Sequence, residues 1–181
     1  EDAGRVLRED MVVSVTPGGD SKRVTRSAYR AQRRGGKGRS GMATRDEDFV
    51  SRLFVANTHT PVLFFSSLGQ VYKMKVWRLP EGGAATRGRP MVNLLPLAEG
   101  EPISTVLALP EDEAEWGALH VMFATARGTV RRNSMDAFTN VPSNGKIAMR
   151  FDEDSDDRLI GVALLSEHDD VLLATRQGKA I

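Results

Sequence analysis

The sequence predicts an all-β, propeller-like fold made of repeated four-stranded units. Three features carry this prediction: short apolar runs bounded by turn residues, turn glycines that recur at a regular spacing, and a base that follows most of these glycines at a fixed offset. Hydrophobic residues make up 40% of the 181 residues and charged residues 27%, which is the composition of a globular protein with a core.

Four apolar runs each lead into a glycine turn, as the strands of a hairpin do. The runs are residues 12–15, 62–65, 121–124 and 171–174, and the glycines are Gly19, Gly69, Gly128 and Gly178. A base stands four residues after each of the first three glycines, at Arg23, Lys73 and Arg132. Successive glycines are roughly 50 to 60 residues apart, the length of a propeller blade, and the longest interval contains an acidic insertion.

The second half of each unit repeats as well. A glycine and a base, followed by a methionine and later by another apolar run, recur around residues 38–57, 88–109 and 145–165. We therefore expect blade-like units at about 11–57, 62–109 and 121–165, with an incomplete fourth unit at 171–181. These are about three and a half blades, whereas a closed ring has typically 4–8. The chain also lacks a starting Met, so we expect a piece of a longer protein.

The apolar runs are continuous rather than alternating, which suits strands buried on both faces between two neighbouring blades. No window shows the 3.6-residue apolar period of an amphipathic helix, so we expect loops rather than helices between the strands. A β-sandwich with chance similarity among its hairpins is the alternative. The shared glycine-to-base offset argues against it.

Basic and acidic residues alternate in blocks along the chain, although the net charge is only +1. Three basic blocks, residues 21–45, 65–90 and 127–150, contain 19 of the 25 bases and 2 of the 24 acids. The acids gather elsewhere, at residues 46–48, 111–115, 152–157 and 167–170. Folded as a repeat, these blocks predict one basic side, which favours a polyanionic partner, and one acidic side made of solvated loops.

The most unusual segment is residues 29–41, which read Y-R-A-Q-R-R-G-G-K-G-R-S-G. Its four glycines allow a flexible backbone, and its arginine forks match phosphate oxygens. We interpret it as a mobile loop that clamps phosphates. A solvated linker is the alternative, but the two further basic blocks at equivalent positions favour nucleic acid.

Other chemistries have weaker support. The G-x-G-x-x-G match at residues 36–41 lacks the preceding strand and following helix of a dinucleotide site. The histidines His59, His120 and His168 have no metal-ligand spacing. Cysteine is absent, which fits a reducing, cytoplasmic compartment, and no apolar run approaches the roughly 20 residues that span a bilayer. We expect no cofactor, no metal, no catalytic residue and no membrane contact.

The seven residues Q-R-R-G-G-K-G resemble the GyrA-box of the C-terminal domain of DNA gyrase A at every position. The box residues are Gln32, Arg33, Arg34, Gly35, Gly36, Lys37 and Gly38. The resemblance extends over essentially the whole chain, including the stretch from residue 54 to 77. One departure is Asp20, where the first hairpin of family members commonly carries an aromatic residue.

The resemblance implies a six-bladed β-pinwheel, a propeller variant in which neighbouring blades exchange strands. It implies a non-catalytic domain that wraps double-stranded DNA around a basic rim, largely without sequence preference, so that the holoenzyme can introduce negative supercoils. The catalytic tyrosine and the ATPase then lie elsewhere, in a heterotetramer of gyrase A and gyrase B in the bacterial cytoplasm and nucleoid.

The repeat adds further DNA-binding candidates on the predicted rim. They are Arg23, Arg26, Arg30, Arg39, Lys73, Lys75, Arg78, Arg131 and Arg132. Two alternatives stay open: the C-terminal domain of topoisomerase IV, whose box is usually degenerate or missing, and a protein-binding propeller module. The intact box favours gyrase over topoisomerase IV.

Overall fold

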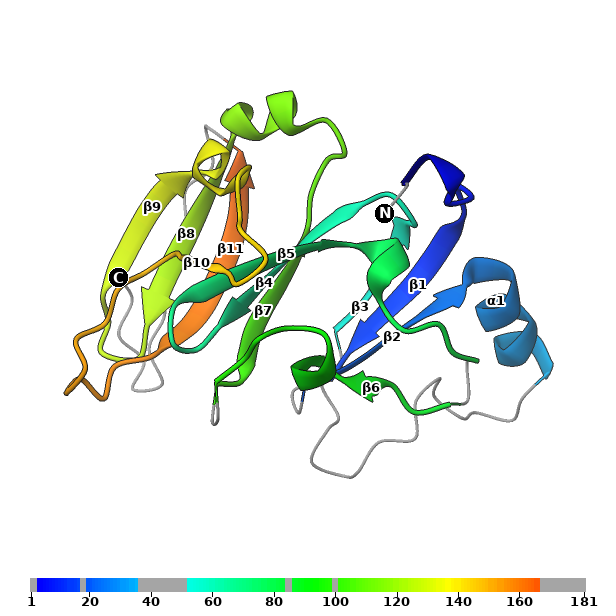
Figure 1. The fold of residues 1–181 in the computed structure, drawn as a ribbon, viewed down its shortest axis with the longest axis horizontal. Helices are drawn as coiled ribbons and strands as arrows, with labels where there is room; N and C mark the ends of the chain where they lie inside the picture. Colours follow the sequence, from blue (N-terminus) through cyan, green and yellow to red (C-terminus); the bar gives the residue numbers. More distant parts are fainter. Residues whose placement is uncertain (1–2, 17–18, 36–51, 84–85, 99–100, 167–181) are drawn as a thin grey trace.

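The computed structural model describes residues 3–16, 19–35, 52–83, 86–98 and 101–166, which form three antiparallel sheets packed side by side (Figure 1). The first sheet has the order β3 (Arg52–Asn57), β1 (Asp10–Val15), β2 (Asp20–Thr25), β6 (Arg89–Pro90). The second has the order β10 (Lys146–Ile147), β5 (Gln70–Lys75), β4 (Pro61–Ser66), β7 (Ile103–Ala108). The third has the order β11 (Leu159–Ser166), β8 (Leu119–Thr125), β9 (Val130–Ser134). The all-β prediction is confirmed.

The first two sheets each take an edge strand from the next unit of the chain. Strand β6 belongs to the second unit but pairs with β2, where Arg89 lies opposite Ser21. Strand β10 belongs to the third unit but pairs with β5, where Lys146 lies opposite Val71. This is the strand exchange that the family resemblance implies. Because both exchanged strands are only two residues long, the apolar pattern could not have revealed them.

Short helices connect the strands, and one of them corrects a sequence-based expectation. Helix α1 (Arg26–Gly35) occupies a segment for which we predicted a mobile loop. The 3-10 helices are η1 (Ala3–Arg5), η3 (Val76–Arg78), η4 (Met91–Asn93), η5 (Glu113–Ala118) and η6 (Met135–Phe138). Helix α1 escaped detection because it has no apolar stripe, although Ala, Arg and Gln are strong helix formers. The Thr25 hydroxyl caps it by accepting the Ala28 N–H at 3.3 Å.

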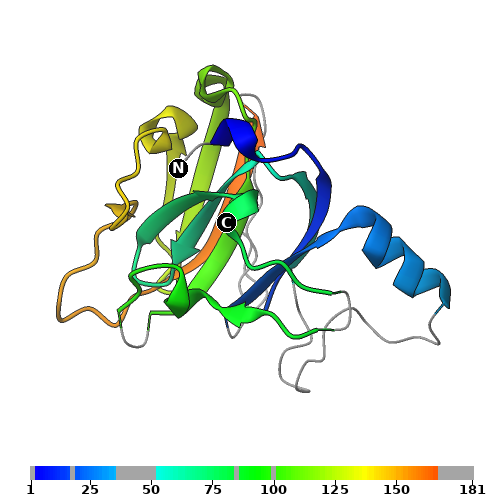
Figure 2. The same cartoon turned by 45° about the vertical axis from the view of Figure 1, so that its right-hand side comes forward.

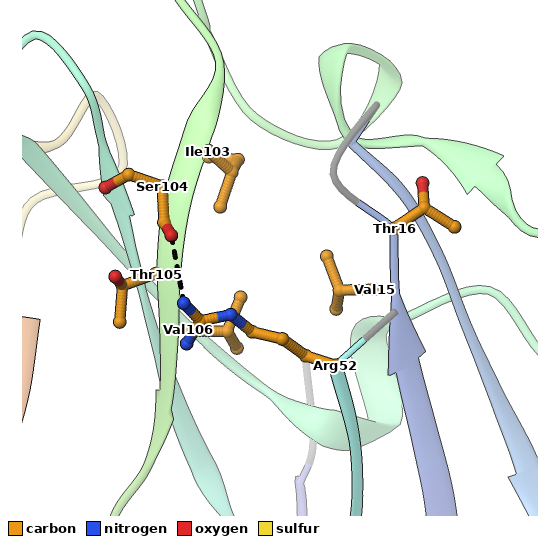
Figure 3. Close-up of a pocket in the computed structure, with 7 residues that line it drawn as sticks. All are labelled: Val15, Thr16, Arg52, Ile103, Ser104, Thr105 and Val106. Atoms are coloured by element: carbon orange, nitrogen blue, oxygen red, sulfur yellow. Dashed lines mark hydrogen bonds between the residues drawn. The ribbon is translucent and has the colours of Figure 1, made fainter. Parts of the chain in front are cut away.

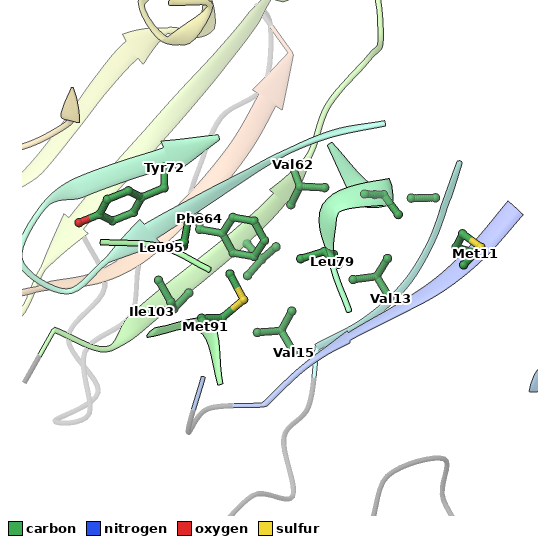
Figure 4. Packing of buried hydrophobic residues seen from close by; sticks show 13 residues of the cluster. Met11, Val13, Val15, Val62, Phe64, Tyr72, Leu79, Met91, Leu95 and Ile103 are labelled. Carbon is green, nitrogen blue, oxygen red and sulfur yellow. The ribbon is translucent and has the colours of Figure 1, made fainter. Parts of the chain in front are cut away.

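Strand β4 is buried along its whole length and contributes to two cores. Val62 and Phe64 belong to the core shared with Val13 of the first sheet (Figure 4). The intervening residues Leu63 and Phe65 belong to the core shared with the third sheet. The prediction of strands buried on both faces between neighbours is therefore confirmed for β4.

The core between the second and third sheets is rich in aromatic residues. Phe65, Phe123 and Phe138 meet edge to face with ring centroids 5.7 to 6.1 Å apart, each pair contributing about 1 kcal/mol beyond its buried area. Trp116 of η5 is fully buried beside them and donates its indole N–H to the Pro110 carbonyl at 2.8 Å. The acidic insertion therefore supplies a core residue and is more than the solvated loop that we expected.

The three hairpin turns share one hydrogen-bond pattern. In the second hairpin, the Gly69 N–H donates to the Ser66 carbonyl at 3.1 Å, and the Gln70 N–H donates to the Ser66 hydroxyl at 3.2 Å. The same pair of bonds recurs with Thr16, Gly19 and Asp20, and with Thr125, Gly128 and Thr129. The glycines have φ of +89°, +84° and +94°, a conformation that disfavours any residue with a Cβ.

Two of these glycines also hold the next unit in place. The Gly69 carbonyl accepts the N–H groups of Ala148 and Met149 at 2.8 and 3.1 Å, and the Gly19 carbonyl accepts the N–H of Met91 at 2.7 Å. The approach is so close that a Cβ on Gly69 would stand 2.0 Å from the Met149 carbonyl oxygen. Hydrogen bonds from these two hairpins to the following units thus add to the connection that the exchanged strands make between units.

The base four residues after the hairpin glycine makes a similar connection. The Arg23 Nε donates to the Leu79 carbonyl at 2.8 Å, where η3 ends, and the Lys73 Nζ donates to the Thr139 carbonyl at 2.6 Å, where η6 ends. Lys73 also pairs with Glu113 and lies 5.3 Å from the centre of the Trp116 ring. A cation at the end of a helical turn is favourable because the last carbonyls carry partial negative charge. The repeated base therefore links successive units.

We expect Gly69→Ala to destabilise the protein by about 3 kcal/mol or more, because it combines the cost of positive φ, about 1–2 kcal/mol, with a main-chain clash. The matched control is Gly128→Ala, which has the same φ requirement but open space around its Cβ, and should lose only about 1–2 kcal/mol. Urea unfolding midpoints measure the difference. Equal losses in the two variants would contradict the close approach of the units.

We expect Lys73→Met to lower the free energy of unfolding by about 1–2 kcal/mol, because it leaves the partly buried Thr139 carbonyl without its donor. Arg132→Met is the control at the equivalent repeat position, where the side chain is exposed, and should change stability by less than about 0.5 kcal/mol. Thermal and urea unfolding check both variants. A larger loss at Arg132 than at Lys73 would rule out the linking role.

Candidate nucleic-acid interface

The two edges of the described sheets carry different charge. Strands β3, β7 and β11 contain one base, Arg52, and no acid. The strands at the opposite edge, β2 with β6, β5 with β10, and β9, contain eight bases and one acid, Asp20. We call these five strands the basic edge. Because β7 and β11 contact each other, the neutral edges converge and the basic edge lies on the far side of the sheets.

Two exposed bases of this edge, Arg131 and Arg132, are held in position by carbonyls, and Arg131 also by an aromatic ring. Arg131 is exposed, donates to the Ala148 carbonyl at 2.6 Å and lies 5.9 Å from the centre of the Phe123 ring. The exposed Arg132 donates to the Ser166 carbonyl at 3.3 Å. A guanidinium has five N–H donors in a planar fork, so an arginine positioned in this way can also bind a phosphate.

Two further rim candidates belong to the second unit, Lys75 on the basic edge and Arg78 just after it. Lys75 ends β5 and donates to the His59 carbonyl at 3.1 Å. Arg78 of η3 is exposed and stacks on Trp77, with its guanidinium carbon 5.5 Å from the ring centre. Both therefore have defined positions on the surface, which lowers the entropy lost when they bind a ligand.

Arg23 and Lys73, also rim candidates, have their charged groups directed toward the protein. Their side chains are 18% and 21% exposed, and they bond the next unit as described above. Arg23 additionally lies 3.6 Å from Glu81. Their contacts favour a structural role over a DNA contact.

Lys22 shapes the loop that follows η3. Its side chain is buried, and Nζ donates to the Gly83 and Thr86 carbonyls at 3.0 and 2.6 Å. Burial lowers the pKa of this amine. Nearby, Arg87 pairs with Asp20 at 3.0 Å, so the residue that departs from the family pattern is an ion-pair partner here.

Helix α1 carries the first part of the GyrA-box. Gln32, Arg33, Arg34 and Gly35 form its last turn. Gly36, Lys37 and Gly38, together with Arg39, lie outside the described residues. Of the other rim candidates on this helix, Arg30 is exposed and Arg26 lies 3.5 Å from Asp10 of β1.

A cavity of about 200 Å³ lies between the first sheet and β7 (Figure 3). Its lining mixes aliphatic side chains with hydroxyl groups, and its one charged group, Arg52, donates to the Ser104 carbonyl at 3.1 Å. It contains no carboxylate and no activated nucleophile among its lining residues, and it lies at the neutral edge. We do not assign it a role in ligand binding.

The remaining titratable groups of the described ranges give no other site. The His59 ring bonds the Val6 carbonyl at 2.9 Å, the ordinary arrangement for a histidine at a strand end. Within those ranges no three His, Asp or Glu side chains are placed to share a metal ion. The helices of the same ranges are too short or too polar to cross a membrane.

Besides Lys22, whose side chain is buried, sequence reasoning missed two bases of the basic edge, Arg89 and Lys146. Both lie on exchanged strands, and both follow a repeated glycine, as the candidate Arg39 does. The same glycine–base repeat could have identified them. The repeat could not predict that Arg89 and Lys146 lie at the basic edge, because their strands pair with the sheet of the preceding unit.

Comparison with known proteins agrees with the fold and the repeat. The family model described as "DNA gyrase C-terminal domain, beta-propeller" matches residues 10–57, 60–110 and 119–166. The DNA gyrase A protein of Rickettsia bellii is 53% identical over 176 residues, which are 97% of this chain and 19% of that protein. The chain thus spans about a fifth of the length of this relative.

Two solved structures share the fold. The C-terminal domain of DNA topoisomerase IV superposes with a TM-score of 0.78 at 22% identity, over 97% of this chain and 52% of that one. The DNA gyrase A C-terminal domain superposes with a TM-score of 0.62 at 20% identity, over 95% of this chain and 53% of that one. Identities this low establish the architecture alone. The family match and the Rickettsia relative establish homology and favour gyrase over topoisomerase IV. The chain belongs to the DNA gyrase C-terminal domain family of β-propellers.

Proposed function

We propose that this chain is a DNA-binding and DNA-wrapping region of a DNA gyrase A protein. The observation that carries the proposal is the basic edge, which places eight bases from three successive units along one side of the sheets, with Arg89, Arg131 and Arg132 exposed. A row of bases that spans several blades can follow a duplex around them, because the phosphates of DNA form a continuous line of negative charge.

Wrapping requires that phosphate contacts offset the cost of bending. Smoothly bending a short duplex by tens of degrees costs on the order of 1–6 kcal/mol. Each charge-assisted contact from Arg or Lys contributes to the compensation. Because such contacts reach the backbone rather than the base edges, binding should be largely independent of sequence.

In this proposal the box and the exposed bases bind different parts of the DNA path. Gln32 to Gly38 and Arg39 fix one end of the DNA path beside α1, while the exposed bases of the basic edge, Arg89, Arg131 and Arg132, continue it. Arg23 and Lys73 act mainly by holding the units together. The presented DNA then serves strand passage by the remainder of gyrase A with gyrase B, in the bacterial cytoplasm and at the nucleoid. The strand-cleaving tyrosine and the ATPase belong to those other parts.

The nearest alternative is the corresponding region of topoisomerase IV, which shares the fold. The seven-residue box, complete in this sequence, favours gyrase. A protein-binding propeller module is the alternative from another class. Its distinguishing property is an affinity for duplex DNA that is weak or insensitive to salt.

The affinity for a duplex of about 150 bp should fall steeply with salt. With roughly 6–10 phosphate contacts, the dissociation constant is expected to rise by about 10³ to 10⁵ between about 50 and 200 mM salt. Fluorescence anisotropy at several salt concentrations measures the slope, and a duplex of scrambled sequence is the control, for which the slope should be the same. A salt-independent affinity would exclude the DNA-wrapping proposal.

Replacing both box arginines, Arg33→Ala with Arg34→Ala, should abolish most of the linking-number change that the protein imposes on a circle. The assay ligates a nicked circle in the presence of the protein and resolves the topoisomers on a gel. The reason is that the two guanidinium forks are expected to fix the DNA path. Lys73→Met is the comparison, since it should alter stability more than topology. Unchanged topology in the double variant would favour the topoisomerase IV alternative or a protein-binding role.

A further inference from the structure

Helix α1 begins directly after β2 at the basic edge and projects away from the first sheet (Figures 1 and 2). Four of its ten residues are arginine and none is acidic. Ala28, Arg30 and Ala31 are exposed, while Tyr29 is half-buried. The helix therefore stands out from the body of the protein as a densely basic element.

The spacing of the arginines matches the helical repeat. Positions 26, 30 and 34 are four residues apart, so they follow one another along one face of α1, with position 33 beside them. At a rise of 1.5 Å per residue these three positions span about 12 Å, on the order of three to four nucleotide steps along a duplex axis. A helix thus presents the bases at a fixed interval that a flexible loop cannot maintain.

This arrangement is unfavourable in the isolated protein. Like charges four residues apart destabilise a helix, and a base in the first turn opposes the helix dipole. Asp10 compensates in part, since its carboxylate lies 3.5 Å from Arg26, but both side chains of this pair are about half exposed. The helix itself supplies no further acid. An external polyanion along the basic face would relieve the repulsion.

We propose that α1 binds DNA as a helix, with the face that carries positions 26, 30 and 34 against consecutive phosphates of one duplex. Helical structure, rather than the flexibility of the glycines, then sets the spacing of the first box residues. This inference rests on the proposed function and adds the element and the conformation through which the box acts. Phosphate binding and helix formation are coupled, so that DNA increases the helix content of the segment.

The test lowers helix propensity without removing any charge. Ala28→Gly with Ala31→Gly changes two exposed positions, and each glycine lowers the helix population about fivefold. The matched control, Ala28→Gln with Ala31→Gln, keeps a strong helix former at both positions. Both variants, the unmodified protein and the double variant Arg33→Ala with Arg34→Ala are compared in the full-length polypeptide. The readouts are the affinity for a 150 bp duplex and the linking-number change of a ligated nicked circle, with unfolding curves to confirm an intact fold.

We expect the glycine pair to weaken DNA binding by about 5- to 20-fold and the glutamine pair by less than twofold. Asp10→Asn should strengthen binding, because it removes a carboxylate that competes with phosphate for Arg26. If the glycine and glutamine pairs behave alike while the arginine variant binds poorly, the helical mode is wrong and the proposed function stands. If none of the variants alters binding or topology, the proposed function fails as well.

Discussion

The structure depends on main-chain hydrogen bonds that pass from each unit to the next. Strands β6 and β10 complete the sheets of the preceding units, and the Gly19 and Gly69 carbonyls accept N–H groups from the units that follow. A sheet left without its neighbour would expose one apolar face and one unpaired edge. Folding of each unit is therefore coupled to the unit after it, which explains why the core residues of β4 divide between two clusters.

The same coupling assembles the basic edge. Arg89 and Lys146 reach it only because their strands pair with the preceding sheet, so the charge of the edge depends on the units being interlocked. Other bases at the edge, Arg23 and Lys73, contribute to the interlocking by bonding the carbonyls that end η3 and η6. The repeated base of Arg23 and Lys73 thus stabilises the contact between units. The repeated base of Arg89 and Lys146, on the exchanged strands, adds positive charge to the edge.

The acidic residues have a more specific role than solvated loops. Glu113 pairs with Lys73 beside the buried Trp116, Glu111 pairs with Arg8 at 2.8 Å, and Asp20 pairs with Arg87. The pair of Glu111 with Arg8 holds the carboxyl pKa below its usual range, because the guanidinium donates to it and stabilises its charge. Acids therefore pair with selected bases, whereas α1 contains four arginines and no acid of its own.

Patterns along the chain were enough to predict the strand-rich class, the repeat, the positive-φ glycines and the family, because each of these depends on local composition or on identity between sequences. Which bases face solvent was settled only by the folded array, since a base four residues after a glycine can reach either water or the neighbouring unit. The array also settled that residues 26–35 form a helix: an exposed helix needs no apolar stripe, so periodicity could not reveal it. The exchanged strands were hidden for a related reason, because two-residue strands owe their conformation to the partner sheet and not to their own sequence.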